Sequence, residues 1–207
     1  MFQHTIKTPL GILSLRVVGL DDSDSRVDLL TPTAEFPPGM SVDGIVAAVI
    51  QITSTQSTSA VRCECVWDHA PASPYPDTGE SLDAQSWDSN GHRVTVGTED
   101  CEVLCRRLPN LGFTEARYPV IYNEDRLSIL IPYVTEGSSF SLHFVIAWRS
   151  LPDPTECSTW FAVDIPHAKL EAANLTTAVN APGAPPFHAD HHPRRVTESQ
   201  RSATPVA

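Results

Sequence analysis

The sequence predicts an all-β fold: a β-sandwich of about eight to ten short strands, jelly-roll-like, with one short helix and an extended C-terminal tail. Two observations predict this fold. Large apolar residues recur at every second position in several short stretches, which is the pattern of strands with one buried face. Strands and helices do not alternate along the chain as a parallel sheet with crossover helices requires. The 207 residues are enough for one compact domain.

The expected strands follow these alternating stretches in chain order. The clearest is 139–149, where Phe140, Phe144 and Trp148 share one face and His143 lies on the opposite face, which we expect to be exposed. The polar residues 135–138 predict a hairpin between this strand and the one before it. Nine strands are expected, at residues 11–18, 26–31, 45–53, 60–68, 92–97, 117–122, 126–133, 139–149 and 158–165.

One short helix is expected after the strand at 92–97. Thr98 can cap its first turn, which is rich in acidic residues, and Arg106 and Arg107 fall in its last turn, as the helix dipole prefers. Pro109 and Asn110 then end it.

The connection 69–91 is far longer than an ordinary loop and contains three prolines. Tyr75 and Trp87 are aromatic residues in an otherwise polar segment, which is typical of a partner-binding surface. The alternative is that both side chains fold back and plug the open end of the sandwich.

Composition and charge exclude several classes of protein. With 14 basic and 25 acidic residues the net charge is −11, so we expect no strong nucleic-acid binding by this chain itself. No apolar run is long enough to cross a bilayer and no secretory signal is visible at Met1, so we expect no membrane association and a cytoplasmic location. Five cysteines is an odd number, which favours free thiols in a reducing compartment.

Four of the cysteines fall in two pairs. Cys63 and Cys65 have strand spacing, and Cys101 and Cys105 lie one helical turn apart. Both pairs are expected to be buried structural thiols; a zinc site made from all four is the alternative, although only the second pair has the usual ligand spacing.

Residues 1–170 are expected to form the sandwich domain, and residues 171–207 a tail that is disordered unless neighbouring chains hold it. The tail contains a possible metal-binding cluster of His188, His191 and His192. Its candidates for contact with a partner are Phe187, Arg194, Arg195 and Arg201.

We find no motif of a hydrolase, a nucleotide-binding loop or a metalloprotease, so we expect no catalytic residues, no cofactor and no enzymatic activity. His69, His92 and His143 lie on different expected elements. An enzyme of the cupin or lectin type would need such residues to converge at one end of the sandwich, and it stays open as an alternative.

The rhythm of short strands over residues 10–165 resembles the jelly-roll coat proteins of small, picorna-like RNA viruses. The resemblance rests on the strand at 46–53, the Ser/Thr-rich link 54–58, the strand at 60–68 with its Pro-rich loop, the segment Leu127–Tyr133 and the closing strand at 140–148. It implies a shell (capsid) subunit that forms a homo- or hetero-oligomer with other shell subunits, in a virion assembled in the host cytoplasm. The basic N-terminal arm of many such coats is missing. A monomeric binding module for a protein or carbohydrate partner is the alternative.

Overall fold

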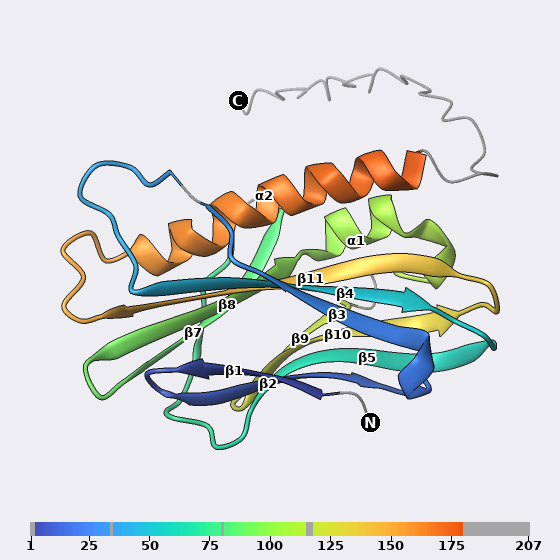
Figure 1. Ribbon diagram of the computed structural model, residues 1–207, viewed down its shortest axis with the longest axis horizontal. Coiled ribbons are helices and arrows are strands. Elements are labelled where there is room, and N and C mark those ends of the chain that lie inside the picture. Colours follow the sequence, from blue (N-terminus) through green and yellow to red (C-terminus); the bar gives the residue numbers. More distant parts are fainter. Residues whose placement is uncertain (1–2, 34, 80, 115–117, 180–207) are drawn as a thin grey trace, which may run out of the picture.

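Two antiparallel sheets face each other in the computed structural model, which describes residues 3–33, 35–79, 81–114 and 118–179 (Figure 1). The five-stranded sheet has the order β1 (Gln3–Thr8), β2 (Gly11–Val18), β5 (Thr58–Trp67), β10 (Arg126–Val134) and β9 (Val120–Asn123). The six-stranded sheet has the order β3 (Ser25–Leu30), β4 (Gly44–Thr53), β11 (Ser139–Ser150), β8 (His92–Glu99), β7 (Leu82–Ser89) and β6 (Tyr75–Pro76). The all-β sandwich is confirmed, with eleven strands in the described part of the chain.

The space between the sheets holds the apolar residues that alternate along the strands. Phe144 of β11 is fully buried there, as its period-two pattern predicts. At one side of this core the rings of Trp67 and Trp87 meet edge to face, with centroids 5.6 Å apart. Such aromatic pairs stabilise a fold by about 0.5–1.5 kcal/mol more than the burial of their surface area alone.

The predicted hairpin at 135–138 is wrong, although the chain does turn there. β10 pairs with β5 and β9, whereas β11 pairs with β4 and β8, so the turn leads from one sheet to the other. Ser54, in the link from β4 to β5, exchanges two backbone hydrogen bonds of 2.9 Å with Gly137 and Ser138. Turn residues identify a chain reversal, but they do not say which strands become neighbours.

The expected short helix is present as α1 (Cys101–Arg107), and its N-cap is Asp100 instead of Thr98. The Asp100 carboxylate accepts the backbone N–H of Val103 at 2.8 Å. Thr98 still belongs to β8, where its hydroxyl donates to the carbonyl of His143 at 2.7 Å.

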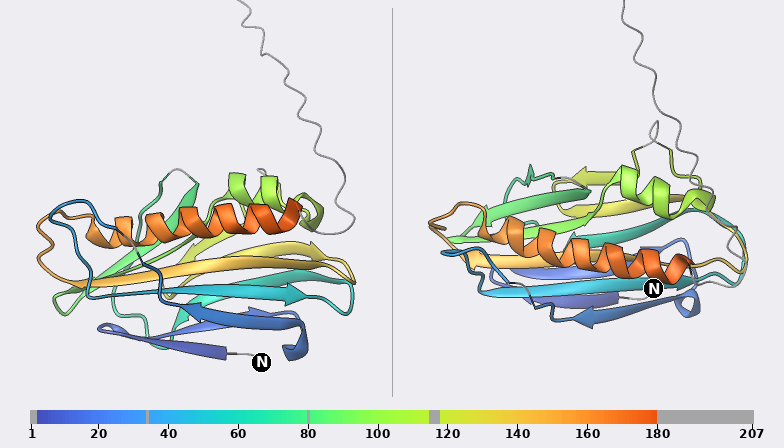
Figure 2. Two further views of the ribbon diagram at one scale, coloured as in Figure 1. Left: turned by 45° about the horizontal axis from the view of Figure 1, so that its top comes forward. Right: turned by 90° about the horizontal axis from the view of Figure 1, so that it is seen from above.

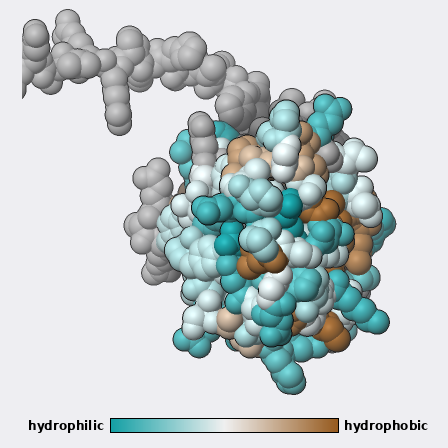
Figure 3. All heavy atoms as spheres, turned by 90° about the vertical axis from the view of Figure 1, so that its left-hand side faces the viewer, coloured by the Kyte–Doolittle hydropathy of each residue, from teal (hydrophilic) through white to brown (hydrophobic). Residues whose placement is uncertain are grey.

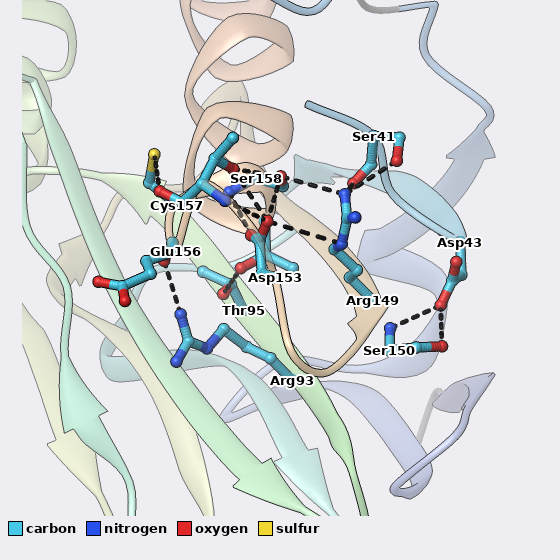
Figure 4. Close-up of polar contacts among 12 residues, drawn as sticks. Ser41, Asp43, Arg93, Thr95, Arg149, Ser150, Asp153, Glu156, Cys157 and Ser158 are labelled. Carbon is cyan, nitrogen blue, oxygen red and sulfur yellow. Dashed lines mark hydrogen bonds and ion pairs between the residues drawn. The ribbon is translucent and has the colours of Figure 1, made fainter. Parts of the chain in front are cut away.

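The strand expected at 158–165 is wrong, because this segment begins a second helix, α2 (Ser158–Val179). Its buried residues come in pairs four positions apart, at 158–159, 162–163 and 166–167, which is helical spacing. The Asp153 carboxylate caps the helix by accepting the N–H of Ser158 at 2.8 Å (Figure 4). A buried hydroxyl contact of 2.9 Å between Thr95 of β8 and Thr159 also ties this end to the sheet.

α2 lies across the outer face of the six-stranded sheet, beside α1 (Figure 2). The helix approaches β8 so closely that a Cβ on Gly97 would lie 2.3 Å from Cγ1 of Val163. Leu82, Ala84 and Val145 complete the apolar contact below the helix. His143 belongs to this covered face, so the expectation that it is exposed is wrong.

The expected long loop 69–91 contains two strands, β6 and β7, and β7 is an inner strand of the six-stranded sheet. α2 runs through the expected domain boundary at residue 170 to Val179. Residues 180–207 lie outside the described residues. The end of the molecule that carries the β1–β2 turn and the link from β11 to α2 is mainly hydrophilic, with apolar residues in separate spots (Figure 3).

Candidate functional site

Three successive inward-facing side chains of β7 reach across to the edge of the opposite sheet. Asp83 accepts the hydroxyls of Tyr118 and Tyr122, the latter at 2.6 Å. Gln85 donates from Nε2 to the carbonyl of Asn123 at 2.6 Å. Trp87 donates from its ring N–H to the carbonyl of Glu124 at 3.0 Å. These bonds close one open side of the sandwich.

A groove of about 580 Å³ lies on this closed side, between β6 of one sheet and β9 of the other. Its volume is within the range of small-molecule sites. The lining residues are Ser73, Pro74, Tyr75, Pro76, Gln85, Tyr122, Asn123 and Glu124.

Gln85 is the one side chain among these lining residues that is almost completely buried, with 2% of its surface exposed. Its Oε1 atom has no hydrogen-bond partner within the described part of the chain. A buried carbonyl oxygen without a partner costs about 1–3 kcal/mol, and most proteins avoid it. Oε1 is itself buried, so a donor in the groove removes this cost only if the Gln85 side chain turns to present this oxygen.

Tyr75 forms one wall of the groove, and Asp88 and Arg93 fix the position of its side chain. Its hydroxyl donates to Asp88 at 3.2 Å, and the Arg93 guanidinium lies 5.6 Å from the ring centroid. Arg93 also makes two hydrogen bonds of 2.8 Å to the Asp88 carboxylate. Burial raises the pKa of Tyr75 to about 12, so the phenol stays neutral. The ring is thus fixed while 37% of its residue surface stays exposed.

Tyr122 forms the opposite wall. Burial, and then its hydrogen bond to Asp83, raises the pKa of its phenol well above its usual range. Burial also raises the pKa of the Asp83 carboxyl, although the two tyrosine hydroxyls oppose this shift. Because its hydroxyl points inward to Asp83, Tyr122 offers ring surface to the groove.

A second polar cluster lies under α2. Arg107 of α1 pairs with Glu99 of β8 at 2.7 Å, and the other Glu99 oxygen lies 3.8 Å from Nδ1 of His143. Nε2 of His143 lies 2.9 Å from Nδ1 of His167 on α2. All four side chains are buried. Burial lowers the pKa of His143 well below its usual range, and the neighbouring His167 and Arg107 lower it further.

Cys63, Cys65 and Cys101 are buried as expected, whereas Cys105 is only partly buried, and the two pairs do not form a four-cysteine site. Cys63 and Cys65 lie in the core between the sheets, and burial raises the pKa of Cys63 to about 12. Cys101 and Cys105 have their sulfur atoms 3.9 Å apart in α1. Within the described residues no group of three or more Cys, His, Asp or Glu side chains is placed to hold a metal ion.

Of the expected partner contacts, Tyr75 is exposed in the groove, whereas Trp87 is fully buried, so the prediction for Trp87 is wrong. Its ring packs on Trp67 because β7 is an inner strand. The tail candidates lie outside the described residues: Phe187, His188, His191, His192, Arg194, Arg195 and Arg201.

The sequence reasoning missed Asp83 and Gln85. One available signal was the spacing of Asp83, Gln85 and Trp87 at alternate positions, which places them on one face of a strand. It also missed the buried cluster, since His143 becomes buried only through the helix that was taken for a strand.

No family model matches this chain, and no curated protein matches it. A solved structure with 8% sequence identity and a TM-score of 0.41 does match, over 86% of this chain and 24% of that chain. It is described as "Putative kojibiose phosphorylase from human microbiome". This chain therefore spans about a quarter of that protein's length.

That match contradicts the expectation that this protein is not an enzyme, because the matched protein carries the name of an enzyme. The expectation is withdrawn. With so low a TM-score the likeness itself carries no argument about a reaction. Within the described part of the chain, no helix has the length and apolar character needed to cross a membrane.

Proposed function

We propose that the protein is a β-sandwich binding module that holds a neutral, hydroxyl-rich ligand of the carbohydrate class in the groove between β6 and β9. The observation that carries the proposal is Gln85, a buried amide at the groove whose Oε1 has no partner in the described residues. A ligand hydroxyl would donate to it. Buried polar groups of this kind give a site its preference for one ligand chemistry.

The charge of the groove favours a neutral ligand over an anionic one. Glu124 is an acidic lining residue, and no lining residue is basic. Two guanidinium groups lie near the lining residues, and both are already bound to carboxylates: Arg93 to Asp88, and Arg126, opposite Asn123, to Asp125. The chain as a whole is acidic, which also disfavours anions.

The walls favour a ring with one apolar face. Tyr75 and Tyr122 present ring surface, and Pro74 and Pro76 add apolar area next to it. A sugar ring has C–H groups on its faces and hydroxyls at its edge, so it can contact such walls while it donates to Gln85 and Glu124. Fixed side chains reduce the entropy that is lost on binding.

The test is a calorimetric titration of the full chain with glucose, maltose and cellobiose as probes. Replacing Tyr75 with Ala should weaken binding about 2- to 10-fold, because it removes one stacking wall. Tyr75→Phe keeps the ring and should bind almost like wild type. Tyr133→Ala is the matched control, because Tyr133 is a similarly exposed tyrosine on β10 (44% against 37% for Tyr75) that does not line the groove. If the wild type binds none of the three sugars, or if Tyr133→Ala weakens binding as much as Tyr75→Ala, the proposal fails.

A second candidate is assembly with further copies of this chain as a shell subunit. It is favoured by a groove of about 330 Å³ at the other open side, between the edge strands β1 and β3. Leu29 and Leu30 on β3 are exposed there, and Trp148 also lines it. Exposed apolar side chains on an edge strand favour pairing with another chain. Light scattering of wild type and Leu30→Lys tests this: a concentration-dependent oligomer that the substitution dissociates supports assembly, and a monomer in both contradicts it.

A further inference from the structure

Four buried ionisable side chains connect α2 to the sheet beneath it, away from the groove. They run in the order Arg107, Glu99, His143 and His167, and each contacts the next. Three belong to α1, β8 and β11, and only His167 belongs to α2. Among the contacts given above, the pair of imidazoles His143 and His167 joins the helix to this chain of polar residues.

We infer that the His143–His167 contact is an acid-sensitive latch, which holds α2 on the six-stranded sheet at neutral pH and releases it when the pair takes up protons. This inference is independent of the proposed ligand. It rests first on the geometry of the contact and then on the charges around it.

The contact needs a neutral nitrogen. Nε2 of His143 and Nδ1 of His167 lie 2.9 Å apart, so one nitrogen donates and the other accepts. If both imidazoles are protonated, both nitrogens carry hydrogens and neither can accept. The ring centroids are 5.1 Å apart, so the two cations would also repel each other in a buried place. The docked helix thus excludes the doubly protonated pair.

The surrounding charges do not compensate fully for such protonation. Glu99 is the nearest carboxylate, but Arg107 already shares its charge at 2.7 Å. Asp164, on α2 itself, interacts electrostatically with His167, and burial raises the pKa of this aspartate. β4 contains no titratable residue. β7 contributes Asp83 and Asp88, which are engaged on other contacts with Tyr118, Tyr122 and Arg93.

The direction of the pH dependence follows from these constraints. An exposed histidine has a pKa of about 6.5, and the pKa of docked His143 is well below that value. Docking of α2 is therefore most favourable above about pH 6.5 and weakens as the pH falls below it. Between pH 7.5 and 5.0 the opening equilibrium should rise about 30-fold if one histidine gains a proton on opening, and about 1000-fold if both do.

The experiment is amide hydrogen exchange of the full chain at pH 7.5 and 5.0, corrected for the intrinsic rates. We expect the protection of peptides from α2 to fall by at least about 30-fold at pH 5.0, while β5 and β10 keep theirs. The double variant His143→Gln, His167→Asn places amide groups where the two contacting nitrogens lie, and amides do not titrate. Its α2 protection should be the same at both pH values. His69→Gln is the control, because His69 is exposed and lies outside the cluster.

Two results would overturn the latch. One is unchanged α2 protection in wild type between pH 7.5 and 5.0. The other is an acid-induced loss in the folded double variant that equals the wild-type loss. If the double variant does not fold, the pH dependence of the wild-type protein decides the matter. Below about pH 6 the logarithm of the opening constant must change by nearly one per pH unit if one histidine gains a proton, and by nearly two if both do; a flat profile contradicts the latch.

Discussion

Gln85 on β7 and Asn123 on β9 are joined by a hydrogen bond of 2.6 Å, although their strands belong to different sheets. Asp83 and Trp87, two positions away on either side, make equivalent bonds across the same gap. One inward row of a single strand thus links both sheets, and its middle member, Gln85, lines the candidate groove.

Removing the Asp83 carboxylate should destabilise the protein through its two tyrosine partners. In Asp83→Leu the hydroxyls of Tyr118 and Tyr122 lose their acceptor, and we expect the free energy of unfolding to fall by about 1–3 kcal/mol. Asp83→Asn keeps an acceptor oxygen and should lose less. Urea denaturation measures both, with Asp28→Leu on the edge strand β3 as the control. Equal losses for Asp83→Leu and Asp28→Leu would argue against a linking role for Asp83.

Trp87→Ala should cost about 3–5 kcal/mol of stability, because it empties a fully buried site beside Trp67. Tyr75→Ala, on the neighbouring strand, should change stability much less, because that side chain is exposed. Thermal denaturation distinguishes the two. A Trp87→Ala protein with wild-type stability would mean that β7 is not an inner strand.

Enlarging Gly97 should push α2 away from the sheet. A Cβ there would lie 2.3 Å from Val163, so Gly97→Ala is expected to cost about 1–3 kcal/mol. Val163→Ala makes room for the new methyl group, and the double variant should be more stable than the sum of the two single losses predicts. A double-mutant cycle by urea denaturation measures this coupling. Strict additivity would mean that the two residues are not in contact.

The stabilisation of the start of α2 by Asp153 should depend on pH, because it needs the ionised carboxylate. Burial opposes ionisation, but hydrogen bonds from Ser158 and Thr155 outweigh it and lower the pKa of Asp153 to about 2. Its usual value is about 3.9, so the stabilisation is complete above about pH 4 and is lost as the pH falls towards 2. Asp153→Ala should cost about 0.5–2 kcal/mol at pH 7, as expected for loss of an N-cap. The difference between wild type and this variant should shrink on acidification below pH 4; a constant difference would contradict the capping role.

Much of the sandwich could be predicted from the sequence, because a strand with one buried face shows its pattern locally. β2 and β11 lie almost where the alternation places them. β7 was missed because its inward row contains Asp83 and Gln85, which are buried by hydrogen bonds to distant residues instead of by apolar character. Polar residues in a strand interior look like loop residues when their partners are unknown.

The start of α2 was misread for a related reason. Phe161, Val163 and Ile165 alternate in the sequence, but the residues that the sheet buries are Ala162, Val163 and His167. The apolar residues of this segment fit both the two-residue repeat of a strand and the 3.6-residue repeat of a helix. Close packing against Gly97 favours the helix. The order of strands in each sheet depends on contacts between distant segments, so neither the groove nor the buried histidines could be located from local pattern.

The proposed function requires the groove between β6 and β9 to bind a hydroxyl-rich ligand through Gln85. The most direct measurement is an NMR titration of the full chain with maltose that follows the side-chain amide signals of Gln85 and of a distant control, Gln51 on β4. We predict that the Gln85 signals shift in a saturable way while those of Gln51 stay fixed. Saturable maltose binding that leaves the Gln85 signals unchanged, or no saturable shift at all, would contradict a binding role for Gln85.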